Sequence, residues 1–277
     1  MPTFKTPDSI KIVAKISDDP HFRGSIHDDS SAQVYGYRSA LVPGPIVYGY
    51  LAQLARQTFG VPWLEFGTMS SNSRRPAFHG DVLTISAEPI VETGDNASMV
   101  LHAYNADGQH IASGAATLSR KRPEPFDPSD YPTSPVMDES PFVDAGGMIP
   151  GVRFFSNPIE VTPAVLDEHL AEFSETWPGY REEGIVPSGY LMRRMVRDTV
   201  LSYRHPTPGI FVSADNQHLA LARVGDVLVT VGVVTREYEK KGNRYFDSTH
   251  VVIANGRKPI AISKRSTVYV ARAAKAA

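Results

Sequence analysis

The chain contains no cysteine among its 277 residues, which excludes disulfide bonds, thiolate metal ligands and a cysteine nucleophile. Any catalytic group must therefore come from histidine, aspartate, glutamate, tyrosine, serine or the backbone. The chain also lacks an apolar run of the roughly 20 residues that a membrane-spanning helix needs, and its N-terminus lacks the apolar core of a signal peptide. We therefore expect a cytoplasmic protein without a membrane partner.

The chain also lacks a strong excess of either charge. Its 28 lysine and arginine residues against 30 aspartate and glutamate residues give a formal charge of −2, and its only basic block is the short run SRKR at 119–122. Such a charge distribution gives no electrostatic reason to expect a nucleic-acid partner. The hydrophobic fraction of 42% is typical of a globular protein.

An internal repeat is present instead. The tetrapeptide Gly-Asp-Val-Leu occurs at Gly80–Leu83 and again at Gly225–Leu228. Alternating apolar and polar residues follow each copy and are broken by turn residues such as Asn105 to Gly108 and Asn255-Gly256. We therefore expect three long antiparallel strands after each copy.

A helix is predicted upstream of each block of strands. The first runs from Pro45 to Phe59 and holds Gly49, and the second runs from Pro187 to Leu201 and holds Gly189. Between the halves, residues 121–150 contain seven prolines, too many for a helix or a central strand. The predicted order of helix and strands is thus repeated on either side of a linker.

The residues with the clearest chemical potential lie between positions 26 and 51. His27, Asp28 and Asp29 supply acid and base groups just before Pro43-Gly44-Pro45, where a helix is expected to begin. The N-terminus of a helix stabilises developing negative charge. Acid and base groups beside such a terminus are typical of a reaction centre for a carbonyl compound.

Four segments carry a resemblance to a known family. GYRSALVPGPIVYGYLAQL is followed by SRRPAFHGDVL, and EFSETWPGYREEGIVPSGYL is followed by HLALARVGDVL. This order resembles that of the MaoC-like hydratase/dehydratase family, over nearly the whole chain. The resemblance implies an α+β double hot dog, in which two fused curved antiparallel sheets each wrap a central helix. It implies an N-terminal, catalytic hot dog over 1–122, a proline-rich linker over 123–150 and a diverged hot dog over 151–277.

The resemblance also implies an activity. Members of the family interconvert a trans-2-enoyl thioester and its 3-hydroxyacyl form by acid/base catalysis, with coenzyme A or a carrier protein holding the acyl group. The family motif is Asp-x-Asn-Pro-x-His-x-Asp, and His27 matches its histidine. Gly49 matches the glycine whose N–H binds the thioester oxygen, and Tyr48 stands where the family has a histidine before that glycine. Phe22 stands where the family has its catalytic aspartate.

Because Phe22 replaces the catalytic aspartate of the family, the carboxylate that would assist His27 has several candidates. Asp28 or Asp29 assists His27, or Asp18 or Asp19 folds back toward it. Alternatively, Asp28 and Asp29 only cap a short helix that ends after Ala32.

Other residues have two interpretations as well. Tyr48 donates to a substrate oxygen or packs in the core, and Glu175 faces a pocket or is an ordinary glutamate. Arg38, Arg74 and Arg75 contact phosphates of a thioester arm or form surface ion pairs. Tyr48, Gly44 and Arg38 complete the set of residues expected to bind substrate.

Two other functions are consistent with the same fold. One is an acyl thioesterase, and the other is an acyl-thioester-binding protein without activity. No histidine spacing indicates a metal site, and we expect no cofactor. Dimers are common in the family, and the exposed sheet edges of such folds favour a homodimer. The chain already contains both halves, however, so a monomer is the alternative.

Overall fold

The computed structural model describes residues 4–272, in which twelve strands form one antiparallel sheet. In the first half the strands are β1 (Ile10–Val13), β2 (Thr68–Ser73), β3 (Val82–Ala87), β4 (Val91–Thr93), β5 (Asn96–Tyr104) and β6 (His110–Ser119). In the second half they are β7 (Arg153–Phe154), β8 (Ile159–Glu160), β9 (Ile210–His218), β10 (Val227–Lys240), β11 (Asn243–Ala254) and β12 (Lys258–Val270). The main path is β1-β3-β5-β6-β2-β9-β12-β11-β10-β7, with β4 beside β5 and β8 beside β10.

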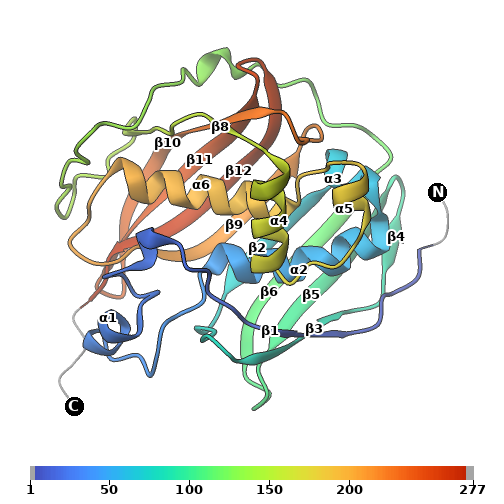
Figure 1. Ribbon diagram of the computed structural model, residues 1–277, viewed down its shortest axis with the longest axis horizontal. Coiled ribbons are helices and arrows are strands. Elements are labelled where there is room, and N and C mark those ends of the chain that lie inside the picture. Colours follow the sequence, from blue (N-terminus) through green and yellow to red (C-terminus); the bar gives the residue numbers. More distant parts are fainter. Residues whose placement is uncertain (1–3, 273–277) are drawn as a thin grey trace.

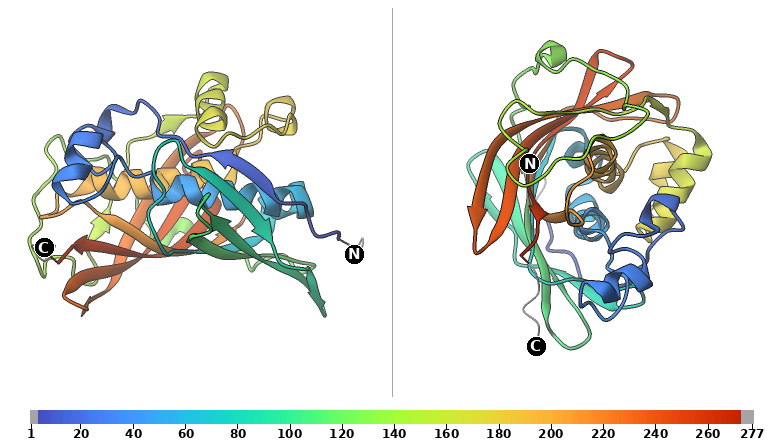
Figure 2. Two further views of the ribbon diagram at one scale, coloured as in Figure 1. Left: turned by 90° about the horizontal axis from the view of Figure 1, so that it is seen from below. Right: turned by 90° about the vertical axis from the view of Figure 1, so that its left-hand side faces the viewer.

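The two halves meet at β2 and β9. These strands pair antiparallel from Thr68 opposite Gln217 to Asn72 opposite Ser213, so one sheet runs through both halves. The sheet is curved, and the two long helices lie on its concave side (Figures 1 and 2). This is the double hot-dog arrangement. The domain limits 1–122, 123–150 and 151–277 stay a prediction.

The helices are α1 (Asp29–Val34), α2 (Gly44–Phe59), α3 (Val61–Phe66), α4 (Pro163–Glu172), α5 (Gly179–Glu182) and α6 (Ser188–Ser202), with 3₁₀ turns η1 (Pro20–Phe22) and η2 (Pro128–Asp130). The helices α2 and α6 correspond to the two predicted helices, and each begins directly after a proline, Pro43 or Pro187. No helix within residues 4–272 is long and apolar enough to span a membrane.

The repeated tetrapeptide makes the same turn in both halves. Gly80 and Gly225 have φ of 85° and 92°, a conformation that favours glycine. Asp81 Oδ2 accepts a hydrogen bond from Phe78 N at 3.0 Å, and Asp226 Oδ2 accepts one from Arg223 N at 2.8 Å. Each turn leads into a strand, as the repeat predicts.

The strands after the first tetrapeptide differ from the prediction. Three long strands follow the second copy, whereas four follow the first because the opening strand is interrupted. Its two parts, β3 and β4, both pair with β5 and are separated by Glu88-Pro89-Ile90. Proline has no N–H to donate to a neighbouring strand, so Pro89 breaks the pairing.

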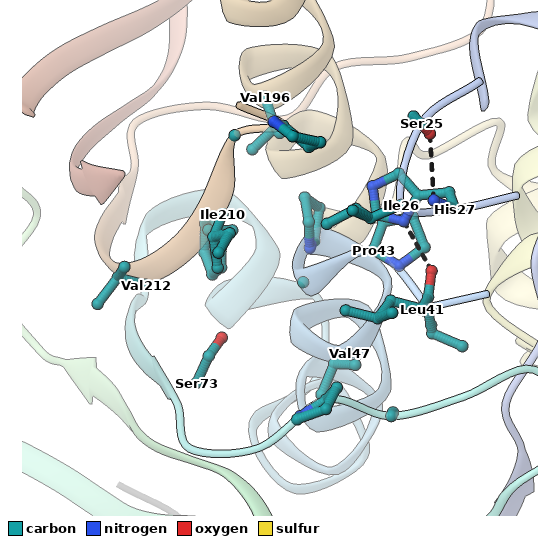
Figure 3. Close-up of a pocket in the computed structure, with 18 of the residues that line it drawn as sticks. Ser25, Ile26, His27, Leu41, Pro43, Val47, Ser73, Val196, Ile210 and Val212 are labelled. Atoms are coloured by element: carbon teal, nitrogen blue, oxygen red, sulfur yellow. Dashed lines mark hydrogen bonds between the residues drawn. The ribbon is translucent and has the colours of Figure 1, made fainter. Parts of the chain in front are cut away.

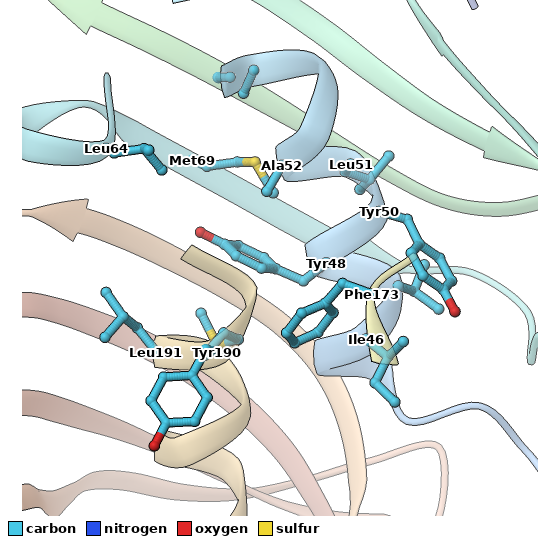
Figure 4. Close-up of a cluster of buried hydrophobic side chains, with 14 of the residues drawn as sticks. Ile46, Tyr48, Tyr50, Leu51, Ala52, Leu64, Met69, Phe173, Tyr190 and Leu191 are labelled. Atoms are coloured by element: carbon cyan, nitrogen blue, oxygen red, sulfur yellow. The ribbon is translucent and has the colours of Figure 1, made fainter. Parts of the chain in front are cut away.

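The helices α2 and α6 touch through glycine. A Cβ atom added to Gly189 would lie 2.9 Å from the Cα atom of Gly49, and Tyr-Leu follows each glycine in the sequence. The ring of Phe173 covers both glycines, and the side chains of Tyr48, Tyr50 and Tyr190 surround the crossing (Figure 4). The two halves therefore share one hydrophobic core.

The proline-rich segment between β6 and β7 contains only the turn η2 as a helical element. Phe126 and Tyr131 of this segment pack on Val231, Val251 and Ile253. Val251 and Val252 point to opposite faces of β11, and Val252 belongs to the core around the long helices. The linker therefore covers part of the sheet face that the helices leave open.

Candidate active site

A cavity of about 330 Å³ lies where the two halves meet. It is enclosed by residues 21–27, by the start of α2, by α6 and by the adjacent ends of β2 and β9 (Figure 3). Most of its wall is apolar, as with Val47, Val196 and Ile210. Of the residues predicted for the site, His27 and Gly44 line this cavity, together with Arg74 and Arg75.

Two hydrogen bonds, one from the backbone and one from the ring, hold His27 in a fixed orientation. The backbone N–H of His27 donates to Ser25 Oγ at 3.1 Å, and its Nδ1 lies 2.6 Å from the carbonyl oxygen of Leu41. A carbonyl oxygen only accepts hydrogen bonds, so Nδ1 carries the ring proton. Nε2 is therefore left with a lone pair that can take a proton.

Burial lowers the pKa of His27 to about 4. The hydrogen bond to Leu41 raises the pKa but does not offset burial, and the positive charge of Arg193 lowers the pKa further. The ring is consequently neutral at pH 7, which is the form that accepts a proton.

Asp28 and Asp29 are both engaged in holding the chain. Asp28 is the N-cap of α1, where its Oδ1 accepts from Ser31 N at 3.2 Å and from Ser30 Oγ at 2.6 Å. Asp29 Oδ1 accepts from Ala40 N at 2.7 Å. Neither lines the cavity. Asp28 therefore fits the capping interpretation, whereas Asp29 holds the backbone at Ala40 and does not cap the helix.

The chain does fold back so that Asp19 comes near the cavity. The ring of Phe22 packs edge-on against His27 at 5.0 Å between centroids, and the guanidinium of Arg193 lies over that ring at 4.7 Å. Arg193 Nη2 donates to Asp19 Oδ2 at 2.8 Å. Phe22 and Arg193 thus lie between this carboxylate and His27.

The partner of Asp19 is a different histidine. His21 Nδ1 lies 2.7 Å from Asp19 Oδ1, and His21 lines the cavity. Burial alone would raise the pKa of Asp19, but hydrogen bonds from His21 and the charges of Arg197 and Arg193 lower it to about 2. Asp19 is therefore ionised at neutral pH. His21 was not predicted as a site residue from the sequence.

At the start of α2, Gly44 lies on the cavity and Gly49 does not. Pro43 O accepts from Ile46 N at 2.9 Å and from Val47 N at 3.3 Å, whereas no acceptor within residues 4–272 is found for Gly44 N. Gly49 lies in the second turn, beyond the first four N–H groups that a helix leaves free. The geometry therefore favours Gly44 as the donor to an oxyanion.

Tyr48 is fully buried in a hydrogen-bonded chain away from the cavity. Its hydroxyl lies 3.0 Å from Ser188 Oγ, which lies 2.7 Å from His218 Nε2, and His218 Nδ1 lies 2.9 Å from Trp63 O. Burial lowers the pKa of His218 to about 4. This Ser-His pair has the spacing of a nucleophile and base, but neither residue lines the cavity.

The cavity carries positive charge. Arg74, Arg75, Arg193 and Arg197 line it, and no aspartate or glutamate of the described chain does. Arg74 and Arg75 are exposed, whereas Arg193 is buried. Arg193 and Arg197 come from α6 at i, i+4 spacing, which places them on one face of the helix.

Two other predicted positions lie away from the cavity. Arg38 pairs with Asp81 and lies 4.1 Å from the centroid of the Phe78 ring. Glu175 pairs with Arg56 at 3.3 Å and accepts hydrogen bonds from Thr176 N and Trp177 N. Among residues 4–272, no group of three histidine, aspartate or glutamate side chains is arranged to hold a metal ion.

The fold is shared with solved structures. A protein assigned as a MaoC domain dehydratase from Chloroflexus aurantiacus has a TM-score of 0.63 at 14% identity, covering 97% of this chain and 96% of that one. The double hot-dog protein Rv0216 of Mycobacterium tuberculosis has a TM-score of 0.64 at 15% identity, with coverage of 95% and 96%. The resemblance to MaoC-like proteins and the double hot-dog fold are therefore confirmed as structural likeness.

A protein assigned as a thioesterase from Novosphingobium aromaticivorans is also similar, with a TM-score of 0.54 at 12% identity over 98% of this chain and 100% of that one. No protein-family model and no curated protein sequence matches the chain. At identities of 12–15% this similarity shows the fold and does not identify the reaction.

Proposed function

We propose that the chain is an enzyme that interconverts a trans-2-enoyl thioester and the matching 3-hydroxyacyl thioester. The observation that carries this proposal is the orientation of His27. Its Nδ1–H donates to the Leu41 carbonyl, and the ring lines an apolar cavity with Nε2 free to act as acid and base.

In the hydration direction, His27 Nε2 takes a proton from water while the water oxygen bonds to the β-carbon. The electron pair of the double bond moves toward the thioester oxygen, where an enolate forms. His27 then returns the proton to the α-carbon, so that one water molecule has been added. The reverse sequence removes it.

The start of α2 lies in the same cavity. Gly44 is the first residue of this 16-residue helix, and its N–H is the donor that we assign to the enolate oxygen. The helix dipole adds to the stabilisation of negative charge there. In this proposal Gly44 takes the oxyanion role that the sequence suggested for Gly49 and Tyr48, and His27 acts without help from Asp28 or Asp29.

The exposed Arg74 and Arg75 provide a place for a phosphorylated thioester arm. Guanidinium groups bind phosphate through charge-assisted hydrogen bonds. Neither side chain forms an ion pair with a described carboxylate within 4.0 Å. We assign these two residues to the phosphates of coenzyme A or of a carrier-protein arm.

Thioester hydrolysis is the second candidate, and the likeness to an assigned thioesterase supports it. A hydrolase of this fold typically uses a carboxylate near the central helix. No carboxylate of residues 4–272 lines the cavity, whereas His27, the acid and base of the proposed hydration, does. For this reason we favour hydration.

The test uses trans-2-butenoyl-CoA and two readouts on one sample. Loss of the absorbance of the conjugated double bond without release of free thiol supports the proposal. Thiol release without prior hydration identifies a thioesterase. Binding of the thioester with neither change identifies a binding protein and contradicts enzymatic function.

A further inference from the structure

A second, smaller cavity of about 30 Å³ adjoins the first. The two cavities share four wall residues: Val196, Val200, Gly209 and Phe211. The small cavity alone is lined by Arg265, His205 and Thr199. A space of this size holds about two water-sized groups, which is also the space that the two oxygens of a carboxylate need.

Arg265 is a buried cation without a matching anion. Its residue is 3% exposed, and its Nη2 donates to Thr199 Oγ1 at 2.6 Å and to His250 Nε2 at 3.1 Å. Its Nε and Nη1 atoms are buried and have no hydrogen-bond partner among the residues that the structure describes. Within residues 4–272, no carboxylate oxygen lies within 4.0 Å of this guanidinium.

Two other buried arginines, Arg193 and Arg194, have carboxylate partners. Arg193 pairs with Asp19 at 2.8 Å and lies 3.6 Å from Glu172, and Arg194 lies 3.6 Å from Asp198. Burial lowers the pKa of Arg265 to about 9. The charge of Asp198, which acts from a longer distance, raises this pKa without offsetting burial. A buried charge without a direct counter-charge is costly, so this position favours an anion.

The surroundings suit a carboxylate at the end of an apolar chain. Both ring nitrogens of His205 are buried and have no partner in the described part of the chain, so a further polar group lines the small cavity. The wall shared with the main cavity is apolar and suits the methylene groups of an acyl chain.

We propose that the cavity at Arg265 binds a carboxylate at the far end of the acyl chain held in the main cavity. This inference rests on the proposed function for the identity of the thioester end. The substrate class it names is the thioester of a dicarboxylic acid, with one end on the carrier and the other free.

The experiment measures binding and requires no turnover. Thioether analogues of acyl-CoA, in which a methylene group replaces the thioester carbonyl, are prepared with chains of four to eight carbons ending in methyl or carboxylate. Their dissociation constants are measured by calorimetry on the full chain. For at least one length we expect the carboxylate form to bind about tenfold or more tightly than the methyl form, as a charge-assisted hydrogen bond provides.

The test variant is Arg265→Met, which removes the charge at similar volume. We expect it to lose the preference for carboxylate and to keep the affinity for the methyl analogue. Arg257→Met, on an exposed turn, is the control and should keep the preference. Arg265→Lys supplies a second variant that retains the charge. Equal binding of both analogues by the unchanged protein at every length would overturn the proposal, as would a preference that survives Arg265→Met.

The competing explanation is that a free small anion, and not the end of an acyl chain, occupies the cavity at Arg265. Thermal unfolding in acetate and in chloride at equal ionic strength tests it. If acetate stabilises the protein through Arg265 while the acyl analogues show no carboxylate preference, the cavity binds free anions and the acyl-end proposal is wrong. If the preference is found but neither butenoyl-CoA nor the enoyl thioester of the preferred dicarboxylic acid is hydrated, this site stands and the proposed reaction fails.

Discussion

At the scale of single residues, the carbonyl of Leu41 determines which nitrogen of His27 carries the proton. The Nδ1 to oxygen distance of 2.6 Å fixes the tautomer, and Nε2 remains available in the cavity. Because Asp28 and Asp29 are bonded to backbone N–H groups elsewhere, this single ring carries the proton transfers in the proposed reaction.

The pH dependence of activity follows from the same ring. Burial holds the pKa of His27 near 4, so the neutral, proton-accepting form persists well below pH 6.5. We expect kcat/KM for butenoyl-CoA to fall on the acid side with an apparent pKa close to 4. Circular dichroism at each pH separates this from unfolding. An acid limb centred near pH 6.5 in folded protein would show that another group controls the reaction.

The sequence predicts part of this site, because neighbouring residues fold together. His27 and Gly44 lie close to each other in the chain, and the prolines around Gly44 mark the helix start that brings both to one cavity. His21 was missed because its only signal is Asp19 two residues earlier. Arg193 was missed as a site residue because its contact with Asp19 spans 174 positions, which local spacing does not reveal.

At the scale of elements, the crossing of α2 and α6 depends on the absence of side chains. Gly49 and Gly189 allow the helix backbones to approach, and Phe173 fills the space beside them. The helix bearing Gly44 and the helix bearing Arg193 and Arg197 are thereby held at a fixed separation, which sets the width of the cavity between them.

Replacing Gly189 with alanine tests this contact. The new methyl group would lie 2.9 Å from the Gly49 Cα atom and 3.1 Å from the Phe173 ring. Overpacking of this kind typically costs about 1–3 kcal/mol, which urea unfolding measures. Gln57→Ala, on the exposed side of α2, is the control and should change stability by less than about 0.5 kcal/mol. An equal effect of both substitutions would contradict the close approach.

The repeat allows the elements to be predicted better than the edges of the sheet. Gly80 and Gly225 mark equivalent turns because each needs a positive φ, and the strands that follow alternate apolar and polar residues. The interruption at Pro89 and the short edge strands β7 and β8 were not predicted. Two-residue strands have no periodicity to detect, and their pairing with β10 depends on tertiary contacts.

At the scale of the whole molecule, the fold buries several neutral histidines. Burial lowers the pKa of His27, His205 and His218 to about 4 each and that of His250 well below its ordinary value. In the unfolded chain these rings bind protons near pH 6.5. The folded state therefore binds fewer protons than the unfolded state between pH 6.5 and 4.

Stability should consequently decrease as the pH falls through this window and be fully present above it. For the fully buried His218 alone, the shift from 6.5 to 4 corresponds to about 3 kcal/mol. Urea unfolding at pH 7 and pH 5 measures the effect, and His218→Asn should reduce the difference between the two values. The same free energy of unfolding at both pH values would contradict the neutral state of these rings.

Charge at the cavity mouth gives a second prediction at this scale. Changing both Arg74 and Arg75 to alanine should raise KM for butenoyl-CoA several-fold, and most strongly at low salt, because phosphate contacts are lost. The corresponding pantetheine thioester lacks the nucleotide phosphates and should be affected less. Arg257→Ala is the matched control. Equal effects on both substrates would place the phosphates elsewhere.

The central claim is that the His27 imidazole performs the hydration, and its most direct test is the rate of double-bond loss in His27→Gln. The glutamine amide keeps a donor for Leu41 O but provides no base. With trans-2-butenoyl-CoA, we expect kcat/KM to fall by about 10²–10⁴-fold with the circular dichroism spectrum unchanged. His102→Gln, where His102 pairs with Glu88 away from the cavity, should keep the rate of the unchanged protein. Full activity in folded His27→Gln would contradict the account.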